Sequence, residues 1–217
     1  MYPKGNLFIP ASHGQLEAIL KEPTGESAKG VALVCHPHPL GQGTMHNKVV
    51  YRAAAGLIDA GLTTLRFNFR GVGASTAEHH GEDEKQDVLD ALDYLSENYP
   101  NQPITLAGFS FGSRIGTEVA MTDERVVRLI SIGTPIDKYD DFDYLENLRK
   151  PILFVHGDKD EFGSVESLNA LVAKVSENTD TKLIVFQDCG HFFDDHLTQL
   201  KNAIHDWTLE KIAESKG

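Results

Sequence analysis

The segment 108–112 carries the strongest chemical signal in the chain, because it reads Gly-Phe-Ser-Phe-Gly between an apolar run at 104–107 and a helical pattern that begins near Gly112. A serine on a tight strand-to-helix turn exposes its hydroxyl, and the flanking glycines let the backbone turn without a Cβ clash. The turn also leaves the backbone N–H of Phe111 at a helix start, where it can face a developing oxyanion. We therefore interpret Ser110 as a nucleophile rather than as part of an ordinary glycine-bracketed turn.

A serine hydroxyl becomes a good nucleophile only when a base removes its proton and a carboxylate orients that base. His191 is the expected base, because it follows the last predicted strand directly and has a glycine before it. The alternative for His191 is a solvated loop histidine. His196 and His205 fall on the terminal helix and are expected at the surface.

Three aspartates are candidates for the orienting acid. Asp160 is the first choice and Asp158 the second, because both follow a strand that should lie near the loop of His191. Asp137, after the preceding strand, is a weaker third candidate. Any one of them could instead belong to a turn or cap a helix.

The first central strand ends in Cys-His-Pro-His-Pro at 35–39. Prolines have no N–H, so only His38 offers a backbone donor between Pro37 and Pro39. A segment stiffened by two prolines suits a preorganised oxyanion donor. His36 and His38 could also form a metal pair, but no further ligand motif follows them, and we predict no metal site.

Short strand patterns alternate with helical ones along the chain. This rhythm predicts an open, mostly parallel sheet with helices on both faces, which places functional sites at the carboxyl ends of the strands. The predicted strands are 16–20 (an outer strand), 31–35, 63–69, 104–107, 127–132, 151–155 and 183–186, and the predicted helices are 47–60, 82–98, 112–121, 165–175 and 195–212.

Length and composition limit the class of protein. The 217 residues suit one domain, 1–217. The 20 Lys+Arg against 32 Asp+Glu give a net charge of −12, which argues against binding nucleic acid or an anionic membrane. Cys35 and Cys189 form no disulfide framework, and no signal peptide or membrane-spanning run is apparent, so a reducing cytoplasmic location is expected.

Six motifs in order resemble the α/β-hydrolase fold, in particular small bacterial hydrolases related to dienelactone hydrolases and the CocE and prolyl-oligopeptidase-like branch. This resemblance implies a Ser110, Asp160, His191 triad, an oxyanion hole from the N–H groups of His38 and Phe111, and no cofactor. Two departures matter: dienelactone hydrolases use a cysteine nucleophile, and relatives often have glycine where Pro37 stands. The motifs lie at 35–39, 43–50, 66–73, 108–112, 156–160 and 190–193.

Only about fifteen residues separate the strand ending near Pro135 from the one starting at Pro151, where larger relatives insert a cap. We therefore expect one short helix at 142–148, no cap domain, and an open site for short or extended ester and thioester substrates. Phe162 and Phe192 are the predicted substrate-binding residues. Phe111 and Phe193 are further candidates for the acyl side.

Several points stay open at this stage. A peptidase or amidase on the same triad, or a non-catalytic binding protein on a hydrolase frame, would fit the same motifs, and a homodimer is compatible with the sequence.

Arg66, Asn68 and Arg70 alternate with apolar residues in a central strand, where they either ring the site or pair with buried carboxylates. Arg66, Arg70 and Lys48 are also the cations that could offset the negative net charge locally.

Overall fold

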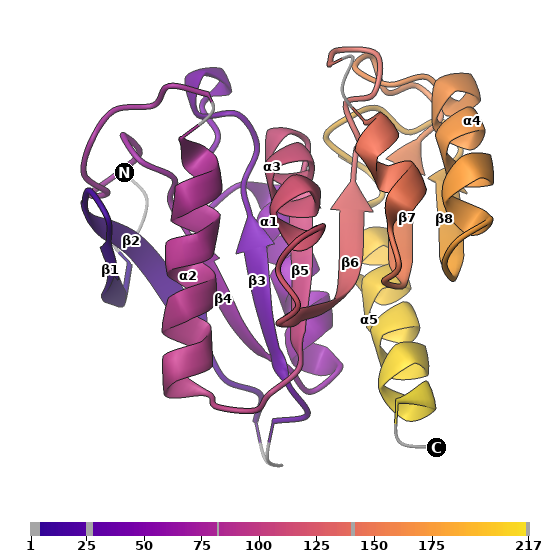
Figure 1. The fold of residues 1–217 in the computed structure, drawn as a ribbon. Coiled ribbons are helices and arrows are strands. Elements are labelled where there is room, and N and C mark those ends of the chain that lie inside the picture. Colours follow the sequence, from indigo (N-terminus) through magenta and orange to yellow (C-terminus); the bar gives the residue numbers. More distant parts are fainter. Residues whose placement is uncertain (1–4, 25–27, 82, 140–141, 216–217) are drawn as a thin grey trace.

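The computed structural model describes residues 5–24, 28–81, 83–139 and 142–215. Its central element is an eight-stranded sheet with the order β1-β2-β4-β3-β5-β6-β7-β8 (Figure 1). The pairs β1–β2 and β2–β4 are antiparallel, and the other pairs are parallel. The strands are β1 (Leu7–Ala11), β2 (Gly14–Lys21), β3 (Val31–Cys35), β4 (Thr63–Phe67), β5 (Ile104–Phe109), β6 (Val126–Ile132), β7 (Ile152–Gly157) and β8 (Thr181–Phe186).

In the part of the chain that the structure describes, five α-helices cover the two faces of the sheet. Alternate strand residues point to opposite faces: Leu33 packs in a core with α2, α3 and α4, and Val34 packs in a second core with α1 and α5. Asn47 caps α1 by accepting a hydrogen bond from the N–H of Val49. The helices are α1 (Lys48–Asp59), α2 (Glu84–Asn98), α3 (Phe111–Ala120), α4 (Val165–Ser176) and α5 (Leu197–Glu214).

Every predicted strand and helix is present, with ends displaced by a few residues; residue 82 of the predicted helix 82–98 lies outside the described residues. The predicted strand 63–69 is too long, because β4 ends at Phe67. Beyond it the backbone N–H of Phe69 donates to Nε2 of His36 and that of Arg70 to Asp87, so side chains replace a strand partner. These contacts join residues far apart in sequence, which local pattern does not reveal.

The amino-terminal strand β1 was not expected from the sequence. It lies at the edge of the sheet, outside β2, so the predicted strand 16–20 is not the outermost one. Pro10 lies in β1, and an edge strand tolerates proline because only one of its sides is paired.

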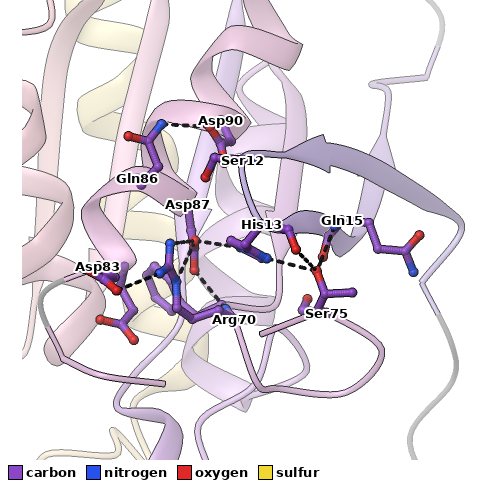
Figure 2. Close-up of polar contacts among 12 residues, drawn as sticks. Ser12, His13, Gln15, Arg70, Ser75, Asp83, Gln86, Asp87 and Asp90 are labelled. Carbon is purple, nitrogen blue, oxygen red and sulfur yellow. Dashed lines mark hydrogen bonds and ion pairs between the residues drawn. The ribbon is translucent and has the colours of Figure 1, made fainter. Parts of the chain in front are cut away.

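Arg70 belongs to a buried polar network that ties the β1–β2 turn to α2. Figure 2 shows Asp87 between Arg70 and His13: its Oδ1 accepts hydrogen bonds from Nε (3.0 Å) and Nη2 (2.7 Å) of Arg70 and lies 3.0 Å from Nε2 of His13. Asp83 adds a second carboxylate 3.2 Å from Arg70. The pairing with buried carboxylates is therefore the correct interpretation for Arg70. The network holds the turn of the edge hairpin against the helix.

The parallel strands run toward the upper edge of the sheet in Figure 1, and the loops after β3, β5, β7 and β8 meet at that edge. Between β6 and β7 the described residues contain only a short 3₁₀ helix, η2 (Asp143–Asn147), in place of a cap domain. The predicted short helix at 142–148 is thus present in 3₁₀ form. Among the described residues, none of the helices has the length and apolar character needed to cross a bilayer.

Candidate active site

Ser110 occupies the turn between β5 and α3 with φ 54° and ψ −120°, a conformation that non-glycine residues rarely adopt. Such a conformation costs about 1–3 kcal/mol and persists only when the surroundings impose it. Here the N–H of Ser110 donates to the carbonyl of Ile132 (2.9 Å), and its own carbonyl accepts from the N–H of Ser113 (2.9 Å). The turn is thereby held from both sides.

The two glycines of the turn are required by close backbone approaches. A Cβ on Gly112 would lie 2.5 Å from the carbonyl oxygen of His36 and 2.6 Å from that of Cys35. A Cβ on Gly108 would collide with the carbonyl of Gly112. The sequence motif is therefore explained by steric contacts of Gly112 with the end of β3 and of Gly108 with the first turn of α3.

His191 and Asp160 are brought together from loops 31 residues apart. Nδ1 of His191 lies 2.7 Å from Oδ2 of Asp160, and both side chains are buried. The other oxygen of Asp160 accepts the N–H of Phe162 (2.9 Å). A carboxylate at Nδ1 favours the tautomer with its proton on Nδ1, which leaves Nε2 of His191 as a hydrogen-bond acceptor.

The imidazole of His191 packs directly against the turn of the serine. Its ring centroid is 4.8 Å from that of Phe109, the residue before Ser110, and 4.6 Å from that of Phe162. Gly133 makes room for this packing, since a Cβ there would lie 3.0 Å from the ring of Phe109 and 3.2 Å from Cε1 of His191. His191 and the turn of Ser110 thus share one aromatic contact.

The other two acid candidates have different partners. Asp158 accepts the N–H of Cys189 (3.0 Å), and this hydrogen bond lowers its pKa. Asp137 accepts the N–H of Ser164 (2.6 Å) at the start of α4, and hydrogen bonds from Ser167 and Ser164 lower its pKa. Each therefore serves as a loop or helix-cap acceptor, and only Asp160 contacts the imidazole of His191.

The rings of His38 and Phe111 pack directly against each other, with centroids 4.8 Å apart. The carbonyl of His38 accepts the N–H groups of Gly41 (3.0 Å) and Gly43 (3.1 Å), which fixes the loop. Among the described residues, the N–H groups of His38 and Phe111 have no acceptor. Burial lowers the pKa of the His38 imidazole, and the charges of His79 and Lys138 lower it further.

His36 has a positioning role that the sequence did not suggest. Its fully buried ring donates from Nδ1 to the carbonyl of Pro37 (2.6 Å) and accepts the N–H of Phe69 at Nε2 (3.0 Å). Burial lowers the pKa of His36 to about 3, so the ring is neutral. Both nitrogens are used within the fold, which leaves no lone pair for a metal.

Arg66 and Asn68 bind the backbone of Met45, in the segment that follows the loop after β3. Asn68 accepts the N–H of Met45 (2.8 Å) and donates to the buried carboxylate of Glu17 (3.0 Å). Arg66 donates to the carbonyl of Met45 (2.9 Å) and lies over the ring of Tyr51. Pairing with a buried carboxylate is thus correct for Asn68 as well, whereas Arg66 binds a backbone carbonyl.

Two of the four aromatic candidates for substrate contact reach the surface near His191. Phe192 is 42% exposed with its ring 5.2 Å from that of His191, and Phe162 packs edge-on against the same imidazole. Phe193 is fully buried in the core with α5, so the expectation that it lines the acyl side is wrong. Phe111 is almost fully buried.

The two cysteines are free thiols packed in different places. Cys35 belongs to the core beneath α2 and α3, and Cys189 to the core beneath α1 and α5. Burial raises the pKa of both thiols, that of Cys189 to about 11. Neither is therefore a thiolate nucleophile at neutral pH.

The fold and the site now define a class of protein. Residues 30–214 match the family model of the alpha/beta hydrolase domain, and the chain belongs to that family. It is 36% identical over 213 residues to an uncharacterised protein of Rickettsia prowazekii, covering 94% of this chain and 88% of that one.

Solved structures agree with the family. An alpha-beta serine hydrolase homologue from Coxiella burnetii is 37% identical with a TM-score of 0.87, covering 95% of this chain and 99% of that one. A lidless serine hydrolase from Xanthomonas campestris is 29% identical with a TM-score of 0.85, covering 97% and 96%. The predictions of a small α/β-hydrolase enzyme without a cap domain are confirmed.

Proposed function

We propose that this hydrolase cleaves carboxylic esters or thioesters through an acyl-enzyme, with Ser110 as nucleophile, His191 as base and Asp160 as the orienting acid. The observation that carries the proposal is the buried His191–Asp160 pair, with a 2.7 Å contact, packed against the ring of Phe109 beside Ser110. A serine in a strained turn, a histidine base and a buried carboxylate together are the arrangement that acyl transfer requires.

The reaction begins when Oγ of Ser110 attacks the scissile carbonyl carbon while its proton passes to Nε2 of His191. The carbonyl oxygen then carries the negative charge, which the N–H groups of His38 and Phe111 stabilise. As the tetrahedral intermediate collapses, the alcohol or thiol leaves with the proton from His191. Water then attacks the acyl-enzyme with His191 again as base, which releases the acid and restores Ser110.

The absence of a cap among the described residues supports small or extended substrates. An open site excludes water poorly, so it favours esters and thioesters over amides, whose leaving group is harder to expel. Phe162 and Phe192 supply apolar surface beside His191. The free buried thiols are consistent with the expected cytoplasmic location.

Labelling with a fluorophosphonate probe tests the nucleophile. Wild-type protein should be labelled at neutral pH and should hydrolyse p-nitrophenyl esters of short acids, whereas Ser110→Ala should lose both properties. Ser113→Ala is the matched control, because Ser113 lies in the first turn of α3 and its buried hydroxyl only donates to the carbonyl of Ser110. A wild-type protein that the probe does not label, or equal labelling of Ser110→Ala, would overturn the proposal.

A further inference from the structure

The three cations that the sequence suggested for offsetting the net charge of −12 each have partners within the fold, and Lys48 also lies 5.9 Å from the ring centroid of Phe192. Arg70 is bound by Asp87 and Asp83, and Lys48 pairs with Asp194. Arg66 binds a backbone carbonyl and lies 5.4 Å from the ring centroid of Tyr51. Carboxylates offset the charges of Arg70 and Lys48, so these residues do not form an unpaired basic patch.

Lys138 is a different case. It lies on the exposed loop after β6, with Nζ 4.8 Å from the ring centroid of Phe162, and that ring packs against the imidazole of His191. Among the described residues Lys138 has no carboxylate partner; its contacts are with the rings of Phe162 and Tyr139. Its charge also reaches the oxyanion loop, since it helps to lower the pKa of His38.

The buried carboxylate of Glu84 lies behind His79, and its charge partly opposes the lowering of the His38 pKa. Glu84 is fully buried, and its Oε1 lies 2.6 Å from Nδ1 of His79, whose ring packs against those of His38 and Phe111. By contrast, Lys159 on the loop after β7 is paired with Asp188 (2.7 Å). Lys138 thus brings an ammonium to the rim of the site, over the ring of Phe162 that packs against His191.

We propose that Lys138 is a specificity-determining residue that binds a carboxylate carried by the ester substrate. The inference rests on the proposed esterase function and names its substrate class. A protein with net charge −12 repels anionic substrates at long range, so a carboxylate is accepted only where a local cation compensates. The ring of Phe162 beneath the ammonium holds it by a cation–π contact while leaving its N–H groups available.

Two pairs of substrates test the proposal and show which part of the ester carries the carboxylate. Mono-p-nitrophenyl adipate is compared with p-nitrophenyl hexanoate for the acyl part, and 4-acetoxybenzoate with its methyl ester for the alcohol part. For each pair, the ratio of kcat/KM for the anionic over the neutral ester is measured in wild type, Lys138→Met, Lys138→Arg and Lys159→Met.

In at least one pair the ratio should fall about tenfold in Lys138→Met, consistent with the loss of one close charge contact at the surface. Lys138→Arg should retain most of the ratio, and Lys159→Met, which removes the same charge from the neighbouring loop, should keep the wild-type value. The wild-type ratio should also fall as NaCl rises from 0.02 to 0.5 M, because salt screens an exposed charge.

A ratio that Lys138→Met leaves unchanged in both pairs would overturn the inference while leaving the esterase function intact. An equal fall in Lys159→Met would also overturn it, because the effect would then reflect net charge alone. A wild-type protein that hydrolyses none of the four esters would overturn the proposed function and this inference together.

Discussion

Acid should destabilise this protein through one buried histidine, His36, whose ring is hydrogen-bonded to the loop after β3. Its folded-state pKa is about 3, because burial disfavours the charged ring, whereas an unfolded chain has a histidine pKa of about 6.5. Between these values the unfolded state binds more protons than the folded state. The free energy of unfolding is therefore greatest above pH 6.5 and falls as the pH drops toward 3.

The size of the effect follows from the two pKa values. From pH 7 to pH 5, His36 alone should lower the free energy of unfolding by about 2 kcal/mol. Urea unfolding of wild type and His36→Asn at both pH values isolates this contribution, because other titrating groups cancel in the difference. The asparagine amide keeps a donor for the carbonyl of Pro37, with which Nδ1 of His36 forms a 2.6 Å hydrogen bond.

The expected result is that wild type loses about 2 kcal/mol more than His36→Asn between pH 7 and pH 5. His205→Asn serves as the control, because His205 is a half-buried helix residue paired with Asp206, and its loss should leave the wild-type pH dependence nearly unchanged. If wild type and His36→Asn lose stability equally, the buried neutral histidine is not the acid-sensitive element and the reasoning fails.

Two further predictions concern the triad and the turn. Asp160→Asn should lower kcat for a p-nitrophenyl ester by about 10³–10⁴ with little change in KM, because Asp160 contacts His191. Asp158→Asn should lower kcat by less than about tenfold, because Asp158 binds only the N–H of Cys189. A similar loss of kcat in both variants would reject Asp160 as the acid. Gly112→Ala should lower Tm by about 5 °C in a thermal melt, because its Cβ would lie 2.5 Å from the carbonyl of His36. Gly41→Ala should melt as wild type does, since its Cβ would have no neighbour within 4 Å; equal melting of all three proteins would contradict the steric argument.

The alternation of strands and helices was predictable because it is written in local hydrophobic period. The buried strand β3 is apolar throughout, and α1 is predicted from its apolar face and ends just before Gly61. The edge strand β1 was not predictable, because it contains a proline and gains its identity only by pairing with β2. Likewise, β4 ends early because His36 and Asp87 accept backbone N–H groups that a longer strand would have paired.

For the site, the sequence by itself determined the serine turn and the order of the candidate residues, because a Gly-x-Ser-x-Gly turn is a local backbone requirement. Only the tertiary structure separated Asp160 from Asp158, two residues apart in one loop, since the choice depends on which carboxylate turns toward His191. The same holds for Lys138, whose place beside Phe162 comes from the meeting of two loops. Local periodicity specifies which elements form, whereas contacts between distant loops decide which side chains meet.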